Sequence, residues 1–309
     1  MISEAGHLIQ AFTAQPLAID EGWLLRLAAG AIAPRELSPH VTEIAAAGDF
    51  QAAEAAMRPP VRSSGGTAVI SVMGPLQKRA DIFTLMFGGT SYDGLTSQLT
   101  AALNDDAIKS IVFNVDSPGG AAEGAAEAAK VIFEARGRKP ITAIANTMMA
   151  SAAYFLGSQA DEVAVTTSGW AGSIGVVMLH MDWSAAFEQA GVKPTLIRSG
   201  KYKVDANPYE PLSEGALAHL QALSDEWYGQ FVSAVARGRG VSESDVRGGF
   251  GQGRMEVAQA AVRAGIADRV ATLDEVLARH GGNASSPRAR AEDSREQLAR
   301  VNALAFAVR

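Results

Sequence analysis

Short apolar runs rich in β-branched residues alternate with longer helical segments through most of the chain after Thr67. Strands are expected at Ala68–Val72, Ser110–Val115, Pro140–Ala145, Val163–Thr166, Ser173–Met178 and Pro194–Arg198. Helices are expected at Tyr92–Leu103, in the Ala-rich stretch that ends at Ala135, near Ala150, at Ser184–Ala190 and at Ser213–Arg237. Strands joined by helices run parallel when they share a sheet. The alternation therefore predicts an α/β fold with a largely parallel sheet.

Three parts are expected along the chain. Residues 1–65 are predicted to form an N-terminal helical arm and linker, because Trp23, Leu24 and Leu27 recur near helical spacing and a stretch rich in Pro and Gly follows. Residues 66–278 are predicted to form the main domain. Residues 279–309 begin with many Gly, Ser, Pro and Arg residues and are predicted to be a flexible tail.

Composition excludes several classes of function. The 309 residues carry a net charge of −6, which provides no basic surface for nucleic acid. The chain has no cysteine, so disulfides, thiolate nucleophiles and Cys-based zinc sites are absent. No carboxylate pair, His-Glu-x-x-His motif or P-loop occurs, and neither a metal nor an organic cofactor is expected.

Targeting signals are not apparent in the sequence. No Lys or Arg precedes Arg26, so the basic region of a secretory signal is missing. The longest apolar stretches are too short or too polar to span a bilayer. We therefore expect a soluble cytoplasmic protein without a membrane partner.

The first candidate site segment is Asp116-Ser-Pro-Gly-Gly120, which follows an expected strand and precedes a helix. Glycine lets a ligand approach the main chain, and free amides at such a junction stabilise a developing oxyanion. An ordinary turn with a helix cap explains the same pattern. Taken alone, this segment does not distinguish the two interpretations.

The second segment places Ser151 directly after a strand and at the start of a helix, among small residues. A helix N-terminus favours negative charge near the hydroxyl group. Met149 and Ala153 occupy the positions that are glycine in the Gly-x-Ser-x-Gly elbow of α/β-hydrolases, so that class does not fit. A plain helix cap is the alternative role of this serine.

The third segment is Ser199-Gly-Lys-Tyr-Lys203. A lysine acts as a general base only where burial or nearby positive charge favours its neutral form. Lys203 is the first candidate and Lys201 the second, although most lysines are solvated surface charges.

Seven segments together resemble the signal peptide peptidase A (SppA) family of serine peptidases, and they occur in the family's order. They are Gly74-Pro75, Thr90-Ser-Tyr92, Asp116-Ser-Pro-Gly-Gly120, Ala150-Ser-Ala-Ala-Tyr154, Gly172-Ser-Ile-Gly-Val176, Ser199-Gly-Lys-Tyr-Lys203 and Ala261–Asp268. The resemblance runs from Val69 to Leu277, about two-thirds of the chain. It implies a ClpP/crotonase-like fold, in which a largely parallel sheet is built from repeated β-β-α units.

The resemblance also implies roles for individual residues. Ser151 matches the nucleophile and Lys203 the general base, while Gly119 and Gly120 match the oxyanion segment. Ser173 matches a serine that helps to orient the lysine in family members. Where the family often has Ser-Gly-Gly, this chain has Ser-Ala-Ala, which keeps small residues beside the nucleophile.

Other bases and other functions stay open. His180 lies 29 residues after Ser151, close to the position of the base in a ClpP-type Ser-His-Asp triad. An inactive assembly subunit would keep the same fold. A crotonase-type acyl-CoA enzyme would need a CoA site and usually a carboxylate base, and the sequence contains neither signal.

Within the family, the chain looks most like the soluble head-maturation (prohead) peptidases of tailed phages and prophages. The segments that carry this likeness are Pro16–Ile19, Gly88–Tyr92 and Lys203–Pro208. The implied substrates are scaffold, portal or capsid proteins, and the implied assembly is a homo-oligomer. A soluble bacterial peptidase of general protein or peptide turnover is the alternative.

Overall fold

The computed structural model describes residues 15–29, 31–32, 34–57, 61–62 and 66–281. Most of the predicted C-terminal tail lies outside the described residues. The strands are β1 (Leu17–Ile19), β2 (Val61–Arg62), β3 (Thr67–Met73), β4 (Leu76–Gln77), β5 (Thr90–Ser91), β6 (Ser110–Ser117), β7 (Gly119–Ala121), β8 (Ile141–Ala150), β9 (Glu162–Val165), β10 (Trp170–Gly172), β11 (Met255–Val257) and β12 (Arg269–Val270). The helices are α2 (Glu21–Ala28), α3 (Pro39–Ala46), α4 (Phe50–Met57), α5 (Ile82–Phe87), α6 (Tyr92–Asn104), α7 (Ala125–Glu134), α8 (Ala152–Gly157), α9 (Ser184–Gln189), α10 (Glu214–Arg239), α11 (Glu243–Gly249), the 3-10 turn η1 (Gly251–Gly253), α12 (Ala258–Arg263) and α13 (Leu273–Arg279).

The larger sheet has the strand order β11-β10-β8-β6-β3-β2, and β9 pairs with β8 and with β12. The pairs β3–β6, β6–β8, β8–β9, β8–β10 and β9–β12 are parallel. A smaller sheet has the order β1-β7-β4-β5. The segment β6-β7-α7 passes from the large sheet to the small sheet and then into a helix, which is one complete β-β-α unit. The predicted α/β fold with a largely parallel sheet is confirmed.

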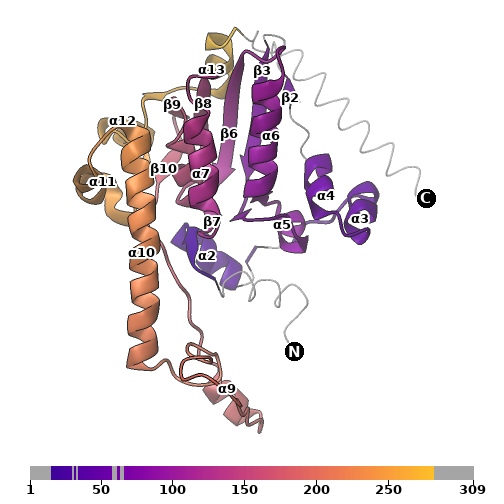
Figure 1. The fold of residues 1–309 in the computed structure, drawn as a ribbon, viewed down its shortest axis with the longest axis vertical. Helices are drawn as coiled ribbons and strands as arrows, with labels where there is room; N and C mark the ends of the chain where they lie inside the picture. Colours follow the sequence, from indigo (N-terminus) through magenta and orange to yellow (C-terminus); the bar gives the residue numbers. More distant parts are fainter. Residues whose placement is uncertain (1–14, 30, 33, 58–60, 63–65, 282–309) are drawn as a thin grey trace.

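Alternation along the central strands sends side chains to two separate cores. On β6, Phe113 and Val115 face the main core, which α6, α7, α8 and the second half of α10 cover. Val112 faces the opposite side, where it packs with Ile144 and with Val276 of α13. Figure 1 shows α6 and α7 running alongside the strands, with α13 near the upper end of the sheet. The carboxyl ends of β6 and β8 consequently lie side by side, and they carry the first two candidate segments.

The N-terminal region packs on the body of the molecule. Strand β1 pairs with β7, and buried Glu54 of α4 accepts hydrogen bonds from the amide and the hydroxyl of Ser91, at 2.6 and 2.5 Å. Helices are present where helical spacing indicated them. The domain boundaries at 65 and 278 stay a prediction.

The strands expected at Ser173–Met178 and Pro194–Arg198 do not form, and that part of the prediction is wrong. Ser173 has a φ of 56°, and the first segment makes only an isolated bridge at Val177. The second lies in the exposed loop between α9 and α10, where no neighbouring strand pairs with it. Strand propensity is realised only where a partner strand is present.

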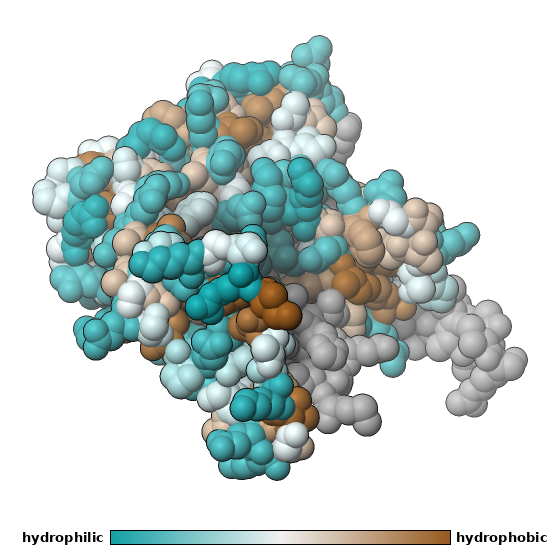
Figure 2. Space-filling view, turned by 60° about the horizontal axis from the view of Figure 1, so that its bottom comes forward, coloured by the Kyte–Doolittle hydropathy of each residue, from teal (hydrophilic) through white to brown (hydrophobic). Residues whose placement is uncertain are grey.

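Residues 178–219, here named the projecting arm, extend away from the sheet at the far end of α10 (Figure 1). The arm closes on itself, since the Trp183 amide donates to the Pro208 carbonyl at 2.8 Å. It exposes large apolar side chains, with Ile197 98% exposed and Tyr202 67% exposed. Figure 2 brings this end of the molecule forward and shows apolar patches among the hydrophilic surface. None of the helices in the described ranges has the length and apolar character needed to cross a membrane.

Candidate active site

Ser151 lies in a sharp turn between β8 and α8. Its φ and ψ are 53° and −119°, a conformation that non-glycine residues rarely adopt. The turn is fixed by surrounding bonds: the Ser151 amide donates to the Gly172 carbonyl at 2.8 Å, and the hydroxyl donates to the Gly175 carbonyl at 3.4 Å. The residue is completely buried, with 0% exposure. Such strain persists only where the structure around it dictates the conformation, and it clusters at functional sites.

Gly119 and Gly120 form β7 beside this turn. Gly119 has a φ of 93°, and a β-carbon there would collide with the Ala18 carbonyl oxygen and lie 2.9 Å from the Ala152 nitrogen. A β-carbon on Gly120 would collide with the backbone of Leu76. Only glycine fits at both positions, which explains the pair. The first two sequence segments are therefore in contact.

Ser117 reduces the choice of oxyanion donor. Its hydroxyl donates to the Gly74 carbonyl at 2.6 Å and accepts from the Gly119 amide at 3.1 Å. The Gly119 amide thus already has a partner. The amide of Ala152, the first residue of α8, belongs to the first turn of a helix, where amides have no intrahelical acceptor. Sequence reasoning did not single out Ala152, although its position directly after Ser151 at a helix start was the available signal.

Ser173 lies in the segment that holds Ser151. It follows Gly172, and its amide donates to the Arg254 carbonyl at 2.9 Å. With Gly175 and residues of β1, β10 and β11, it lines a cavity of about 460 Å³. Ser173 is thus within the neighbourhood predicted for it, while its role toward the lysine stays a prediction.

Lys203 is not brought to Ser151 within one chain. It lies on the projecting arm, where its side chain is exposed. Its amide donates to the Gly200 carbonyl at 3.3 Å, but in the part of the chain that the structure describes its ammonium has neither a hydrogen bond nor an ion pair. The serine and the lysine of the predicted pair therefore occupy different regions of the molecule.

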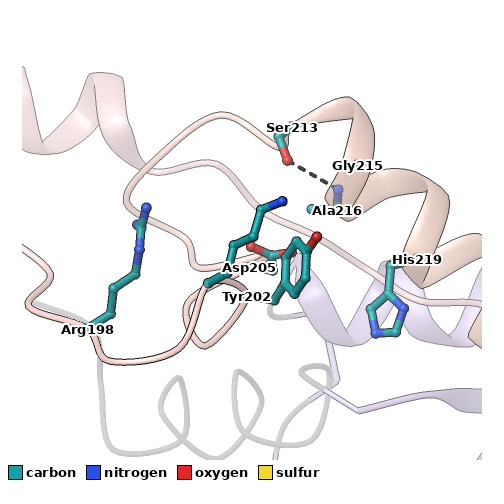
Figure 3. A pocket seen from close by; sticks show the side chains of 8 residues that line it. Arg198, Tyr202, Asp205, Ser213, Gly215, Ala216 and His219 are labelled. Carbon is teal, nitrogen blue, oxygen red and sulfur yellow. Dashed lines mark hydrogen bonds between the residues drawn. The ribbon is translucent and has the colours of Figure 1, made fainter.

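Lys201 belongs to a separate pocket on the arm. The pocket has a volume of about 500 Å³ and is lined by Arg198, Lys201, Tyr202, Asp205, Ser213, Gly215, Ala216 and His219 (Figure 3). The Lys201 ammonium lies 4.8 Å from the centre of the Tyr202 ring. Figure 3 shows the loop side chains facing the start of α10, where Ser213 caps the helix through the Ala216 amide at 3.1 Å. This pocket does not include Ser151.

His180, the competing base, also has another partner. Its Nε2 lies 3.1 Å from the Asn207 carbonyl oxygen, which ties two parts of the arm together. No hydrogen bond joins His180 to Ser151 among the described residues. None of the three candidate bases, Lys203, Lys201 and His180, is therefore placed beside the nucleophile by a single chain.

Two buried tyrosines hold the site segments in place. The Tyr92 hydroxyl donates to the Ala121 carbonyl of β7 at 2.6 Å, and the Tyr154 hydroxyl of α8 donates to the Ile266 carbonyl at 2.9 Å. Burial raises the pKa of Tyr92 and of Tyr154 well above the usual range, so both hydroxyls keep the proton that they donate. Burial also raises the pKa of Asp116 at the end of β6, while a hydrogen bond from the Met148 backbone opposes the shift.

Comparison with known proteins identifies the family. Residues 134–284 match the profile of the family described as Peptidase family S49, and this range contains Ser151, Ser173 and Lys203. The chain carries a peptidase family S49 domain. The geometry around Ser151 is thus the candidate active site of an S49 domain, and the described residues hold no cluster of metal-ligating side chains.

Individual relatives of the S49 domain include phage proteins. "Capsid assembly protease C" of Escherichia phage lambda is 35% identical over 212 residues, which cover 69% of this chain and 48% of that protein. "Head-tail preconnector protein GP5" of Enterobacteria phage P21 is 34% identical over 216 residues, or 70% of this chain and 43% of that protein. A relative from Enterococcus faecium, whose name places it among the SppA signal peptide peptidases, is 30% identical over 189 residues, or 60% and 54% of the two chains. The chain spans about half the length of the curated relatives it matches, and the predicted resemblance to SppA peptidases and their phage branch is confirmed.

Proposed function

We propose that the protein is a serine endopeptidase whose nucleophile is Ser151. The observation that carries this proposal is the buried, positive-φ turn at Ser151, set against Gly119 in an S49 domain. A strained turn between a strand and a helix holds a hydroxyl in a fixed direction beside backbone amides. A hydroxyl in a fixed direction is required for attack on a peptide carbonyl, and nearby backbone amides are required to stabilise the oxyanion that forms.

The proposed reaction uses Lys203 as general base. Neutral Lys203 accepts the Ser151 proton while Oγ bonds to the carbonyl carbon, and one backbone amide of the Gly119–Gly120 segment, together with that of Ala152, binds the oxyanion. The intermediate collapses, the peptide C–N bond breaks, and the lysine ammonium returns the proton to the leaving amine. Water then attacks the acyl-enzyme with the lysine again as base, which releases the acid and restores Ser151.

We further propose that Ser151 and Lys203 meet across a homo-oligomer. Two observations support this arrangement: the lysine lies on an arm that projects from the body, and the arm exposes Ile197, Tyr202 and Leu217 to solvent. Monomeric proteins rarely expose large contiguous apolar patches, and large patches mark interaction sites. A neighbouring copy seated on the arm would cover these side chains and take the lysine out of water, as a lysine base requires.

The proposed substrates are proteins of an assembling phage head, such as scaffold, portal or capsid proteins. The names of the lambda and P21 relatives support this choice. The SppA-type relative supports the alternative, a peptidase of general protein or peptide turnover. An inactive assembly subunit is the remaining alternative, and intact Ser151 and Lys203 argue against it.

Hydrolysis of an unfolded protein by purified wild type, Lys203→Ala and His180→Ala tests the mechanism, with Ser151→Ala as the blank. We expect Lys203→Ala to fall to the blank and His180→Ala to stay active. If His180→Ala is inactive while Lys203→Ala remains active, the general base is His180 and not Lys203.

Co-expression with neighbouring head proteins tests the substrates. If an active enzyme does not process these proteins, the result would favour a role in general protein turnover.

A further inference from the structure

Strand β1 is inserted between the two segments that surround Ser151. On one edge it pairs antiparallel with β7, in the register that sets Ala18 opposite Gly120. On the other edge Leu17 pairs with Val177, with amide-to-carbonyl distances of 3.0 and 2.8 Å in the two directions. A strand from the N-terminal region therefore uses the hydrogen-bonding edges on both sides of a slot beside the nucleophile.

The carbonyl of Ala18 occupies the candidate oxyanion segment. The Asp20 amide donates to the Pro118 carbonyl at 2.7 Å, which marks a hydrogen-bonded pair of the ladder. Hydrogen-bonded pairs alternate along an antiparallel ladder, so the pair two residues further on, Ala18 and Gly120, is hydrogen-bonded as well. The Ala18 oxygen therefore accepts from the Gly120 amide, one of the two amides predicted to bind the oxyanion.

The same oxygen also faces the start of α8. A β-carbon built on Gly119 would meet both the Ala18 oxygen and the Ala152 nitrogen, so these two groups border one small space. With β1 in place, Ser151 has 0% exposure. The described conformation thus leaves the nucleophile inaccessible and places a backbone carbonyl of the chain itself beside both candidate donors.

The side chains of β1 alternate in a way that suits this position. Leu17 and Ile19 are buried in a cluster with Leu24 and Leu27 of α2 and the phenylalanines of α5. Ala18 points to the opposite face, into the main core. The large side chains anchor the strand, while the small one lies in the main core, which also contains Ala152 next to the nucleophile.

We propose that β1 is an intrasteric strand, which fills the place of an extended polypeptide substrate with Ala18 at the position of the residue whose carbonyl is attacked. This inference rests on the proposed peptidase function of Ser151. An extended peptide binds to a protein by adding a strand to free sheet edges, and at Ser151 the edges of β7 and Val177 are the ones available. Substrate and β1 compete for them, so cleavage requires β1 to leave the slot.

A reversible covalent lock tests the inference. The chain has no cysteine, so Leu17→Cys/Val177→Cys contains a single thiol pair. Hydrogen-bonded antiparallel partners have Cα atoms about 5.5 Å apart, within the range of a disulfide. The measured quantities are the rate of Ser151 labelling by a fluorophosphonate and the rate of hydrolysis of an unfolded protein. Each is measured before and after reduction, with the two single-cysteine variants as controls.

We expect the oxidised enzyme to be labelled and to hydrolyse at least about tenfold more slowly than the reduced enzyme, with full recovery on reduction. Equal rates in the two redox states, with the cross-link verified by mass, would show that β1 does not obstruct the substrate, and the peptidase function would stand. If neither wild type nor the reduced variant is labelled or active, the proposed function itself fails, and the inference fails with it.

Hydrogen exchange on wild type provides a second measurement that needs no variant. A peptidyl phosphonate that bonds to Ser151 and carries three residues on its N-terminal side would fill the slot. We expect the Leu17 and Ala18 amides to lose protection when it binds. Unchanged protection on fully modified enzyme would overturn the inference.

Discussion

The surroundings of Ser151 and the projecting arm that carries Lys203 are built in opposite ways. Around the serine, adjacent strands, glycines without room for a β-carbon and two buried tyrosines hold the backbone of β7 and α8 in place. On the arm, the main chain between α9 and α10 is irregular, Ile197 is almost fully exposed, and Lys203 has no side-chain partner among the described residues. The difference is the basis of our proposal that one chain completes the nucleophile and its oxyanion segment, whereas the base depends on a surface that a second copy covers.

The largest expected effect comes from Gly119→Ala, which tests whether the serine region tolerates change. The new methyl group would collide with backbone atoms of β1 and α8, and residue 119 would keep a positive φ. We expect hydrolysis to fall by at least about 100-fold and the free energy of unfolding by about 1–3 kcal/mol.

Gly137→Ala is the matched control for this substitution. Gly137 also has a positive φ, of 78°, but a β-carbon there would have nothing within 4 Å. It should lower the free energy of unfolding by about 1 kcal/mol through strain alone and leave hydrolysis intact. Equal losses of activity in the two variants would contradict the close contact between Gly119 and the Ser151 turn.

The part of the fold that sequence predicted corresponds to the first of these regions. The runs that became β3, β6 and β8 are buried on both faces, so an apolar β-branched pattern was sufficient. The Ser151 turn was predicted from its place between a strand and a helix. The position of Leu17–Ile19 in the slot beside Ser151 was not predicted, because a run of three apolar residues does not reveal which strand it pairs with.

The arm was the harder region for sequence reasoning. Pro194–Arg198 has the composition of a strand, but its surroundings supply no sheet edge, so it stays irregular. The motif around Lys203 indicated a base beside the nucleophile, and a sequence does not say whether the two belong to one copy or to two. That information resides in contacts between surfaces, which local patterns do not encode.

Ile197→Ser sharpens the comparison on the side of the arm. Burying an isoleucine side chain in an interface contributes about 1.5–3 kcal/mol, so the variant should associate roughly 10- to 100-fold more weakly. Its monomer should unfold at the same denaturant concentration as wild type, because Ile197 is 98% exposed. Light scattering across a dilution series measures the association.

Leu25→Ser, on α2 and 57% exposed, is the control outside the arm. It should leave association unchanged. If both substitutions weaken association equally, or if neither does, the arm is not the interface between copies.

The smallest expected effect concerns α13, which lies at the opposite end of the molecule from the arm (Figure 1). The His280 Nε2 lies 2.9 Å from the Thr142 hydroxyl. Burial lowers the pKa of His280; the nearby positive charge of Arg279 lowers this pKa further, whereas the negative charge of Glu162 raises it. A lowered folded-state pKa means that the unfolded chain binds more protons, so stability is complete above the unfolded value near 6.5 and falls as pH drops below it. Between pH 7.5 and 5.5 we expect a decrease of roughly 1–3 °C in Tm from this group.

His280→Gln should remove that part of the pH dependence, and calorimetry of both proteins at the two pH values measures it. Hydrolysis per folded molecule should be unaffected, because α13 packs on the face of the sheet opposite α8. An unchanged difference in Tm between the two pH values would assign the effect to another group.

Subunit mixing tests the central claim most directly. Ser151→Ala and Lys203→Ala, each inactive alone, are mixed in equal amounts under conditions that allow subunits to exchange, and hydrolysis of an unfolded protein is measured. If the serine of one copy works with the lysine of another, activity should return to about a quarter of the wild-type value, because half of the copies supply each group. A mixture that stays silent after verified exchange would show that both groups act within one chain, and the division between body and arm proposed here would be wrong.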